Sequence, residues 1–163
     1  MTLYDLLNKY QMTVTTAESC TGGLVASGLV DLAGISAFFK EGYVTYAPEA
    51  KERILGVPKE VIAQYGVVSV QTAAKMAEGA AKAANADTAI ATTGVAGPDG
   101  GTKQNPVGTV CFGCFVKNRI YTVCKHFEGN RAKVRQQAAI FALDYLKECI
   151  QTFENSCEME KKA

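Results

Sequence analysis

The segment DTAIATTG at residues 87–94 most constrains the fold, because nearly all of its side chains are small or apolar. A strand with this composition is buried on both faces, as strands are when helices cover both sides of a sheet. The β-branched segment MTVTTA at 12–17 predicts a second, shorter strand. Patterns typical of helices alternate with patterns typical of strands along the chain. We therefore predict an α/β fold, a single layered α/β/α domain with a mixed sheet.

The other predicted elements complete this layout. Thr2 and Asp5 form a capping-box pattern that begins an N-terminal helix, and Ser69 is a candidate N-cap. Further helices are predicted at 21–32, 48–55, after Pro58, at 69–84 and from about Asn130. Further strands are predicted at 37–47, 107–116 and 120–127, of which the last two form a hairpin. The residues after about 152 are polar, so we expect the last helix to fray there.

The composition excludes several classes of protein. The 163 residues are 48% hydrophobic and 20% charged, which is typical of one globular domain spanning 1–163. The formal net charge of +1 provides no field that would attract nucleic acid or an anionic membrane. No apolar run approaches the roughly 20 residues of a membrane helix, and the N-terminal MTLYDLLNKYQ lacks the pattern of a signal peptide. We expect a cytoplasmic protein without nucleic-acid or membrane partners.

The cysteines do not predict a metal or redox site. The chain has one histidine, His126, and six cysteines, Cys20, Cys111, Cys114, Cys124, Cys149 and Cys157. Their neighbours are apolar and no secretion signal precedes them, so we expect reduced thiols. Cys111 and Cys114 match the C-x-x-C pattern of redox and zinc sites. Because they lie three apart in a predicted strand, their side chains point to opposite faces and cannot share a metal.

The segment TTAESCTGG at 15–23 places a serine between a predicted strand and a predicted helix. The backbone N–H groups of residues 20–23 would be unpaired there and could stabilise an oxyanion. The ordinary alternative is that Ser19 only caps the helix. A serine nucleophile needs a base. Lys51, which follows Tyr46 at another strand–helix junction, could be that base if burial lowers its pKa, or it could be a solvated helix lysine.

Two further junctions could bind a ligand. TTGVAGPDGG at 92–101 matches neither the P-loop nor the dinucleotide fingerprint, and it is either a ligand wall or a structural turn. In GNRAKVRQ, three cations stand in the first turns of the last helix, where the helix dipole disfavours them. Arg131 and Arg135 are four apart and share a face. This pattern favours a phosphate site, and the alternative is a solvated basic face.

Six motifs occur in the order typical of one family: TAESCTGG, GYVTYAPEAK, GVVS, TTGVAGPDGG, NPVGTV and GNRAKVRQQA. Over roughly residues 1–150 the chain resembles the CinA C-terminal domain family, the nicotinamide-nucleotide amidohydrolases. The resemblance implies hydrolysis of nicotinamide mononucleotide to nicotinate mononucleotide and ammonia, in pyridine nucleotide recycling. It also implies a stand-alone form of the domain, a small-molecule substrate as its partner, no cofactor and no metal. We expect the chain to form a homo-oligomer.

The resemblance implies a mechanism as well. Ser19 matches the family's nucleophile and Lys51 its catalytic lysine, with Tyr46 as a further catalytic residue. Neutral Lys51 would take the Ser19 proton while Oγ attacks the carboxamide carbon. The N–H groups of residues 21–23 would stabilise the oxyanion, ammonia would leave, and water would hydrolyse the acyl-enzyme.

The implied binding residues come from all three junctions. The strand-end threonine of the family falls on Thr93, or on Thr92, because ATTG departs in detail from the family's pattern. The arginine expected to hold the 5′-phosphate falls on Arg135, with Arg131 as its neighbour. The full set is Thr21, Gly22, Gly23, Thr93, Gly94, Arg131 and Arg135.

Two other functions use the same segments. A non-catalytic nucleotide-binding or regulatory module would keep the pocket but turn nothing over. A thiol hydrolase would use Cys20, the neighbour of Ser19, as its nucleophile.

Overall fold

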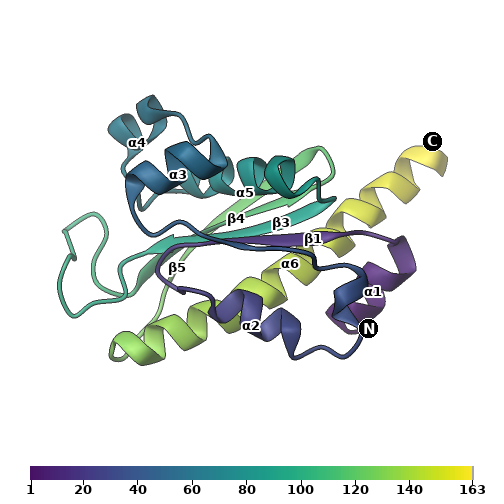
Figure 1. Cartoon of the computed structure of the whole chain (residues 1–163), viewed down its shortest axis with the longest axis horizontal. Coiled ribbons are helices and arrows are strands. Elements are labelled where there is room, and N and C mark those ends of the chain that lie inside the picture. Colours follow the sequence, from purple (N-terminus) through teal and green to yellow (C-terminus); the bar gives the residue numbers. More distant parts are fainter. Residues whose placement is uncertain (163) are drawn as a thin grey trace.

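The structure, a computed structural model, describes residues 1–162, and the side chains of residues 1–160 (Figure 1). In chain order its elements are α1 (Leu3–Tyr10), β1 (Val14–Glu18), α2 (Leu24–Val30), the 3₁₀ turn η1 (Ile35–Ala37), β2 (Tyr43–Val44), α3 (Pro48–Leu55), α4 (Lys59–Tyr65), α5 (Val70–Ala84), β3 (Thr88–Gly94), β4 (Thr109–Val116), β5 (Arg119–His126) and α6 (Arg131–Lys162). In this part of the chain, no helix combines the length and apolar character needed to cross a membrane.

The five strands form one mixed sheet in the order β2-β1-β3-β4-β5. β1 pairs in parallel with β2 and β3, whereas β3–β4 and β4–β5 are antiparallel. Figure 1 shows α3, α4 and α5 on one side of the sheet and α1, α2 and α6 on the other. The predicted α/β fold with a mixed sheet between two helical layers is confirmed.

Each face of the sheet packs against a different kind of helix. On the α6 side, alternate residues of β4 such as Phe112 pack with Leu146 and Ile150 in the larger core. On the α5 side, small residues of β1 and β3 pack with the alanines of α5. Gly113 of β4 lies against the Ala73 carbonyl, where a Cβ would have no room. Small residues therefore let α5 approach the sheet closely, and this fixes the helical layer that carries α3.

Two predicted boundaries are wrong. Residues 37–47 form only the two-residue strand β2 and a single bridge between Phe39 and Val14. One reason is that the Thr15 hydroxyl donates to the Glu41 carbonyl at 2.8 Å, which replaces a ladder bond. The last helix does not fray near 152 but continues to Lys162. Phe153 stays buried against the core, and this apolar contact extends the helix.

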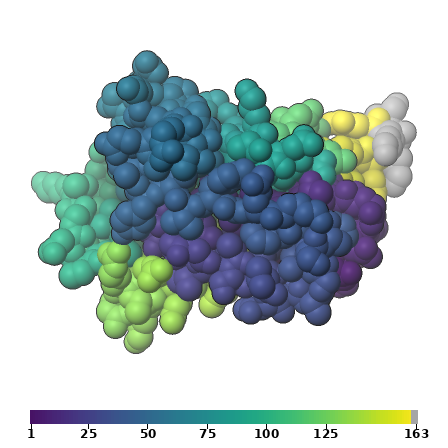
Figure 2. All heavy atoms as spheres, viewed as in Figure 1, coloured from purple at the N-terminus to yellow at the C-terminus, as the bar shows by residue number. Residues whose placement is uncertain are grey.

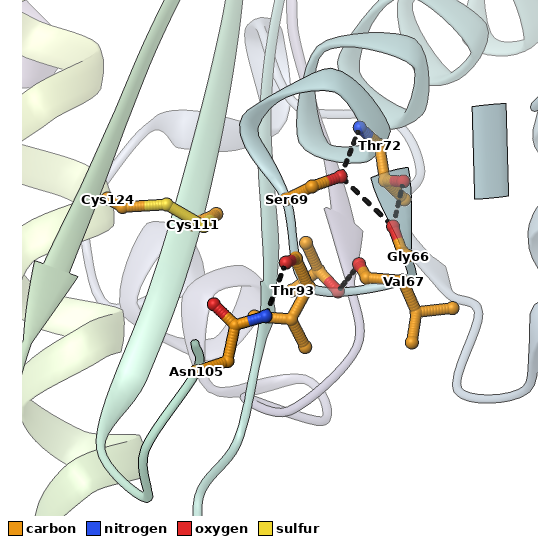
Figure 3. The surroundings of a disulfide bond; sticks show 9 residues. Gly66, Val67, Ser69, Thr72, Thr93, Asn105, Cys111 and Cys124 are labelled. Carbon is orange, nitrogen blue, oxygen red and sulfur yellow. Dashed lines mark hydrogen bonds between the residues drawn. A yellow bond between two sulfur atoms is a disulfide. The ribbon is translucent and has the colours of Figure 1, made fainter. Parts of the chain in front are cut away.

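The prediction of six reduced cysteines is also wrong. Cys111 and Cys124 form a disulfide, whereas Cys20, Cys114, Cys149 and Cys157 are free (Figure 3). Cys111 and Cys124 are directly opposite in the β4–β5 register, and such residues point to the same face at close distance. Cys111 and Cys114 do point to opposite faces, because Cys114 packs in the core under α6. The C-x-x-C pattern is therefore not a joint ligand site.

Candidate active site

The site lies where β1 and β3 end, beside the start of α3. Ser19 directly follows β1 and donates its N–H to the Thr92 carbonyl at 3.0 Å. Lys51 of α3 is 1% exposed, and its Nζ donates to Ser19 Oγ at 3.0 Å. The same Nζ donates to the carbonyls of Thr45 at 2.7 Å and Tyr46 at 3.3 Å. The sequence-predicted Ser–Lys pair is thus in direct contact.

Burial changes the acid–base behaviour of Lys51. Removal from water lowers the pKa of its ammonium from 10.5 to about 8, and the nearby Cys20 thiol acts weakly in the opposite direction. Among residues 1–160, no carboxylate lies within ion-pair distance of Nζ. A neutral amine keeps two N–H groups for the carbonyls of Thr45 and Tyr46, so its lone pair can face Ser19 Oγ. The geometry therefore suits a lysine that accepts the serine proton.

The turn after Ser19 differs from the sequence prediction. α2 begins only at Leu24, because Gly22 and Gly23 adopt positive φ angles of 58° and 103°. The Gly22 N–H donates to the Ser19 carbonyl at 3.1 Å, and the Gly23 N–H donates to Glu18 Oε2 at 2.9 Å. The prediction that these two N–H groups are unpaired is therefore wrong. Within the described residues, neither the Cys20 N–H nor the Thr21 N–H donates to another residue. Of the two residues, Cys20 lines the cavity beside Ser19, so its N–H is the better placed oxyanion donor.

A cavity of about 320 Å³ opens beside the Ser–Lys pair. Six predicted site residues line it, namely Ser19, Tyr46, Lys51, Thr93, Gly94 and Arg131. The other four, Thr21, Gly22, Gly23 and Arg135, are not part of its lining. Figure 2 shows the glycine-rich loop after β3 and the start of α6 at the surface of the same end of the molecule. The volume and the few polar groups suit a small molecule.

The two arginines of α6 have different surroundings. Arg131 lines the cavity and donates to the Gly97 carbonyl at 2.7 Å and to the Tyr46 hydroxyl at 2.9 Å. Arg135, one turn later, donates from Nε to the Cys20 carbonyl and from Nη2 to the Thr21 carbonyl, both at 3.0 Å. Arg131 is therefore at the cavity, whereas Arg135 contacts the backbone of the Ser19 turn.

The two threonines at the end of β3 are also distinct. Thr93 lines the cavity, and its hydroxyl donates to the Val67 carbonyl at 2.6 Å (Figure 3). Thr92 points to the other face of the sheet and shares a hydrogen bond of 2.7 Å with the Thr21 hydroxyl. Of the two candidates in ATTG, Thr93 is therefore the one at the cavity.

Sequence reasoning missed one wall of the cavity. Val67 and Val68, between α4 and α5, line it, and Asn105 donates to the Val68 carbonyl at 3.0 Å (Figure 3). In the sequence, Val67 and Val68 are an apolar pair between Gly66 and the N-cap Ser69, and such a pair is too short to predict a strand. Within the described residues, no group of three or more metal-ligating side chains is arranged to hold a metal ion.

Known proteins are similar to this chain in sequence and in fold. The family profile described as the CinA C-terminal domain matches residues 1–150. The nicotinamide-nucleotide amidohydrolase PncC of Enterobacter agglomerans is 51% identical over 131 residues, which are 80% of each chain. A putative competence-damage inducible protein of Clostridium novyi is 50% identical over 90% of this chain, but the match spans only 36% of that longer protein. The chain thus covers about a third of the length of several curated relatives.

Solved structures agree with the sequence matches. A CinA superfamily protein of Klebsiella pneumoniae superposes with a TM-score of 0.88 at 38% identity, covering 92% of this chain and 94% of that one. The corresponding values for a CinA superfamily protein of Escherichia coli are 0.87, 41%, 90% and 86%. Sequence and fold therefore agree that this chain belongs to the CinA C-terminal domain family.

Proposed function

We propose that this chain hydrolyses the carboxamide of nicotinamide mononucleotide to nicotinate mononucleotide and ammonia. Its Enterobacter agglomerans relative is named a nicotinamide-nucleotide amidohydrolase, which supports the proposal. The observation that carries the proposal is the 3.0 Å contact between Lys51 Nζ and Ser19 Oγ at the wall of a small-molecule cavity. A serine paired with a lysine of lowered pKa is an arrangement for acyl transfer.

In the first half of the reaction, neutral Lys51 accepts the Ser19 proton as Oγ bonds to the carboxamide carbon. The Cys20 N–H donates to the resulting oxyanion. The C–N bond then breaks, and the Lys51 ammonium gives its proton to the leaving nitrogen, which departs as ammonia. In the second half, Lys51 accepts a proton from water as the water attacks the acyl ester. That proton returns to Ser19 Oγ when the nicotinate product leaves.

Arg131 is the residue that we propose to hold the 5′-phosphate. It carries an exposed guanidinium at the rim of the cavity, and arginine binds phosphate through paired N–H groups. Its bond to the Tyr46 hydroxyl connects the phosphate position to the segment that supplies the two carbonyl acceptors of Lys51. Tyr46 would thus link substrate binding to the placement of the base.

The thiol alternative has less support. Burial raises the pKa of the Cys20 thiol to about 11, so little thiolate is present at neutral pH. If Cys20 were the nucleophile, Cys20→Ala would abolish ammonia release and Ser19→Ala would not. We expect the reverse, with Ser19→Ala losing turnover and Cys20→Ala keeping most of it.

The deciding experiment measures ammonia and nicotinate mononucleotide formed by the purified chain from nicotinamide mononucleotide. Saturable binding without turnover would instead support the non-catalytic module. A cytoplasmic location and a homo-oligomer remain part of the proposal. The mass of the purified chain in solution tests the oligomer.

A further inference from the structure

Two charged side chains hold the turn that carries Ser19 from opposite sides. The Glu18 carboxylate accepts the N–H groups of Gly23 and Val25 at 2.9 and 3.0 Å on Oε2, and that of Ala26 at 2.8 Å on Oε1. The Arg135 guanidinium donates to the carbonyls of Cys20 and Thr21. Glu18 therefore fixes the N–H side of the turn, and Arg135 fixes its carbonyl side.

The Glu18 side chain is buried, so its hydrogen bonds to the turn are an integral part of the fold. Its side chain is fully buried, and within residues 1–160 no cation lies at ion-pair distance. A buried carboxylate is costly unless it is well hydrogen-bonded, and here the start of α2 supplies all three N–H donors. Glu18 is the last residue of β1, and Ser19 follows it directly. These bonds therefore connect the end of the strand before Ser19 to the start of α2 after it.

Arg135 completes the arrangement from α6, which lies on the same side of the sheet as α2. Its Nη2 is so close to the turn that a Cβ added at Gly22 would lie 3.2 Å from it. Arg135 does not line the cavity, and its guanidinium donates hydrogen bonds to two backbone carbonyls. Arg131, one turn earlier on α6, is the guanidinium at the cavity.

We infer that Arg135 and Glu18 are positioning residues of the nucleophile, and that Arg135 is not a phosphate ligand. Together they hold Ser19 Oγ at Lys51 Nζ and leave the Cys20 N–H unpaired beside the cavity. This inference rests on the proposed function only in taking Ser19 as the nucleophile, and it does not depend on which substrate is hydrolysed.

A kinetic comparison separates positioning from phosphate binding. Arg135→Met and Arg131→Met form a matched pair, assayed with nicotinamide mononucleotide and with nicotinamide riboside, which lacks the phosphate. Arg135→Met should lower kcat about 100-fold on both substrates with little change in KM, because a small displacement of a reacting group costs about this much. Arg131→Met should raise KM for the mononucleotide alone. A loss by Arg135→Met confined to the KM of the mononucleotide would overturn the inference.

A second readout follows Ser19 without any substrate. A fluorophosphonate probe labels an activated serine, and mass spectrometry locates the label. Arg135→Met, Arg135→Lys and Glu18→Gln should label Ser19 at least about tenfold more slowly than the wild type. Lys133→Met, which removes an exposed cation of α6 away from the cavity, should label at the wild-type rate. Melting temperature and circular dichroism identify which variants are folded, and Arg135→Lys and Glu18→Gln are the milder changes.

Wild-type labelling rates in folded Arg135 and Glu18 variants would reject the positioning role. If the wild-type chain is labelled at Ser19 but releases no ammonia from nicotinamide mononucleotide, the proposed substrate is wrong, and the labelling rates still decide the roles of Arg135 and Glu18.

Discussion

The parallel strands β1 and β3 carry polar side chains at both ends of the pair, and the two ends use them differently. At the amino end, the Asp87 carboxylate accepts the N–H and the hydroxyl of Thr13, both at 2.9 Å, and the Asp87 N–H donates to that hydroxyl at 3.0 Å. These groups satisfy one another. At the carboxyl end, Lys51 is buried against a hydroxyl and two carbonyls.

The difference makes only the carboxyl end suitable for the proposed chemistry. The Asp87 carboxylate accepts two local hydrogen bonds and stabilises the start of the strands. A buried lysine without a counter-ion is held in an environment that disfavours its charge, so it can release and accept a proton near neutral pH. In this fold, we therefore expect reactivity at the buried cation that lacks an anionic partner. The number of polar residues at a strand end does not predict it.

The largest effect is expected from replacing Lys51, the residue at the carboxyl end of the strands whose Nζ can gain and lose a proton. Lys51→Arg keeps a positive charge, but arginine does not deprotonate, so kcat should fall about 1,000-fold or more, close to the loss in Lys51→Ala. Ammonia release measured at saturating substrate tests this, with binding followed separately. An arginine variant with near-normal kcat would rule out Lys51 as the base.

The next effect is the pH dependence of the same group. Burial lowers the pKa of Lys51 to about 8, and in the proposed mechanism the neutral amine is the active form. The value of kcat/KM should therefore rise about tenfold per pH unit below 8 and level off above it. A profile that is flat between pH 6 and 9 would contradict this. Asp87→Asn is the matched control, because it alters the amino end and should leave the profile unchanged.

A smaller effect is expected at the amino end, and on stability alone. Asp87→Ala removes two hydrogen bonds to a carboxylate and should lower the free energy of unfolding by about 2 to 3 kcal/mol. Turnover should stay within about twofold, because these contacts lie at the opposite end of β1 and β3 from Ser19. Urea unfolding and ammonia release measure the two quantities. A large loss of turnover in a folded Asp87→Ala chain would remove the distinction between the ends.

The smallest effect has the opposite sign. Lys51→Met removes a buried charge and should raise the free energy of unfolding at pH 7 by about 1 to 2 kcal/mol. The pKa of Lys51 is lower in the folded chain than in the unfolded one, so the unfolded chain binds more protons between about pH 8 and 10.5. The free energy of unfolding of the wild type should therefore increase relative to that of the variant across that pH range. Urea unfolding at pH 7 and 10 measures it, and an unchanged difference would contradict the charge as its cause.

Local signals in the sequence were enough for the parts of the fold that depend on neighbouring residues. Pro48 at the first helical position and Ser69 as an N-cap gave α3 and α5 their predicted starts. The pairing of Ser19 with Lys51 could be predicted because both follow strand ends, and the ends of adjacent parallel strands meet at one edge of the sheet.

The remaining features depend on contacts between distant segments. The disulfide requires the β4–β5 register, which the cysteine spacing alone does not give. Arg131 and Arg135 share a helix face, yet a difference of one turn brings the first to the cavity and the second to the Cys20 carbonyl. Likewise, the N–H groups of the Ser19 turn were expected to be free because nothing in TAESCTGG shows that the Glu18 side chain folds forward onto α2.

The shortness of β2 has a consequence for self-association. An exposed sheet edge offers unpaired backbone groups on which another chain can add a strand, and this is a common route to aggregation. β2 presents only Tyr43 and Val44 at one edge, too few residues to template a stable addition. At the other edge β5 carries Arg119 and Lys125, cations that oppose strand addition. Both edges thus oppose extension of the sheet, and we expect copies of this chain to associate through helical surfaces rather than by growing a continuous sheet.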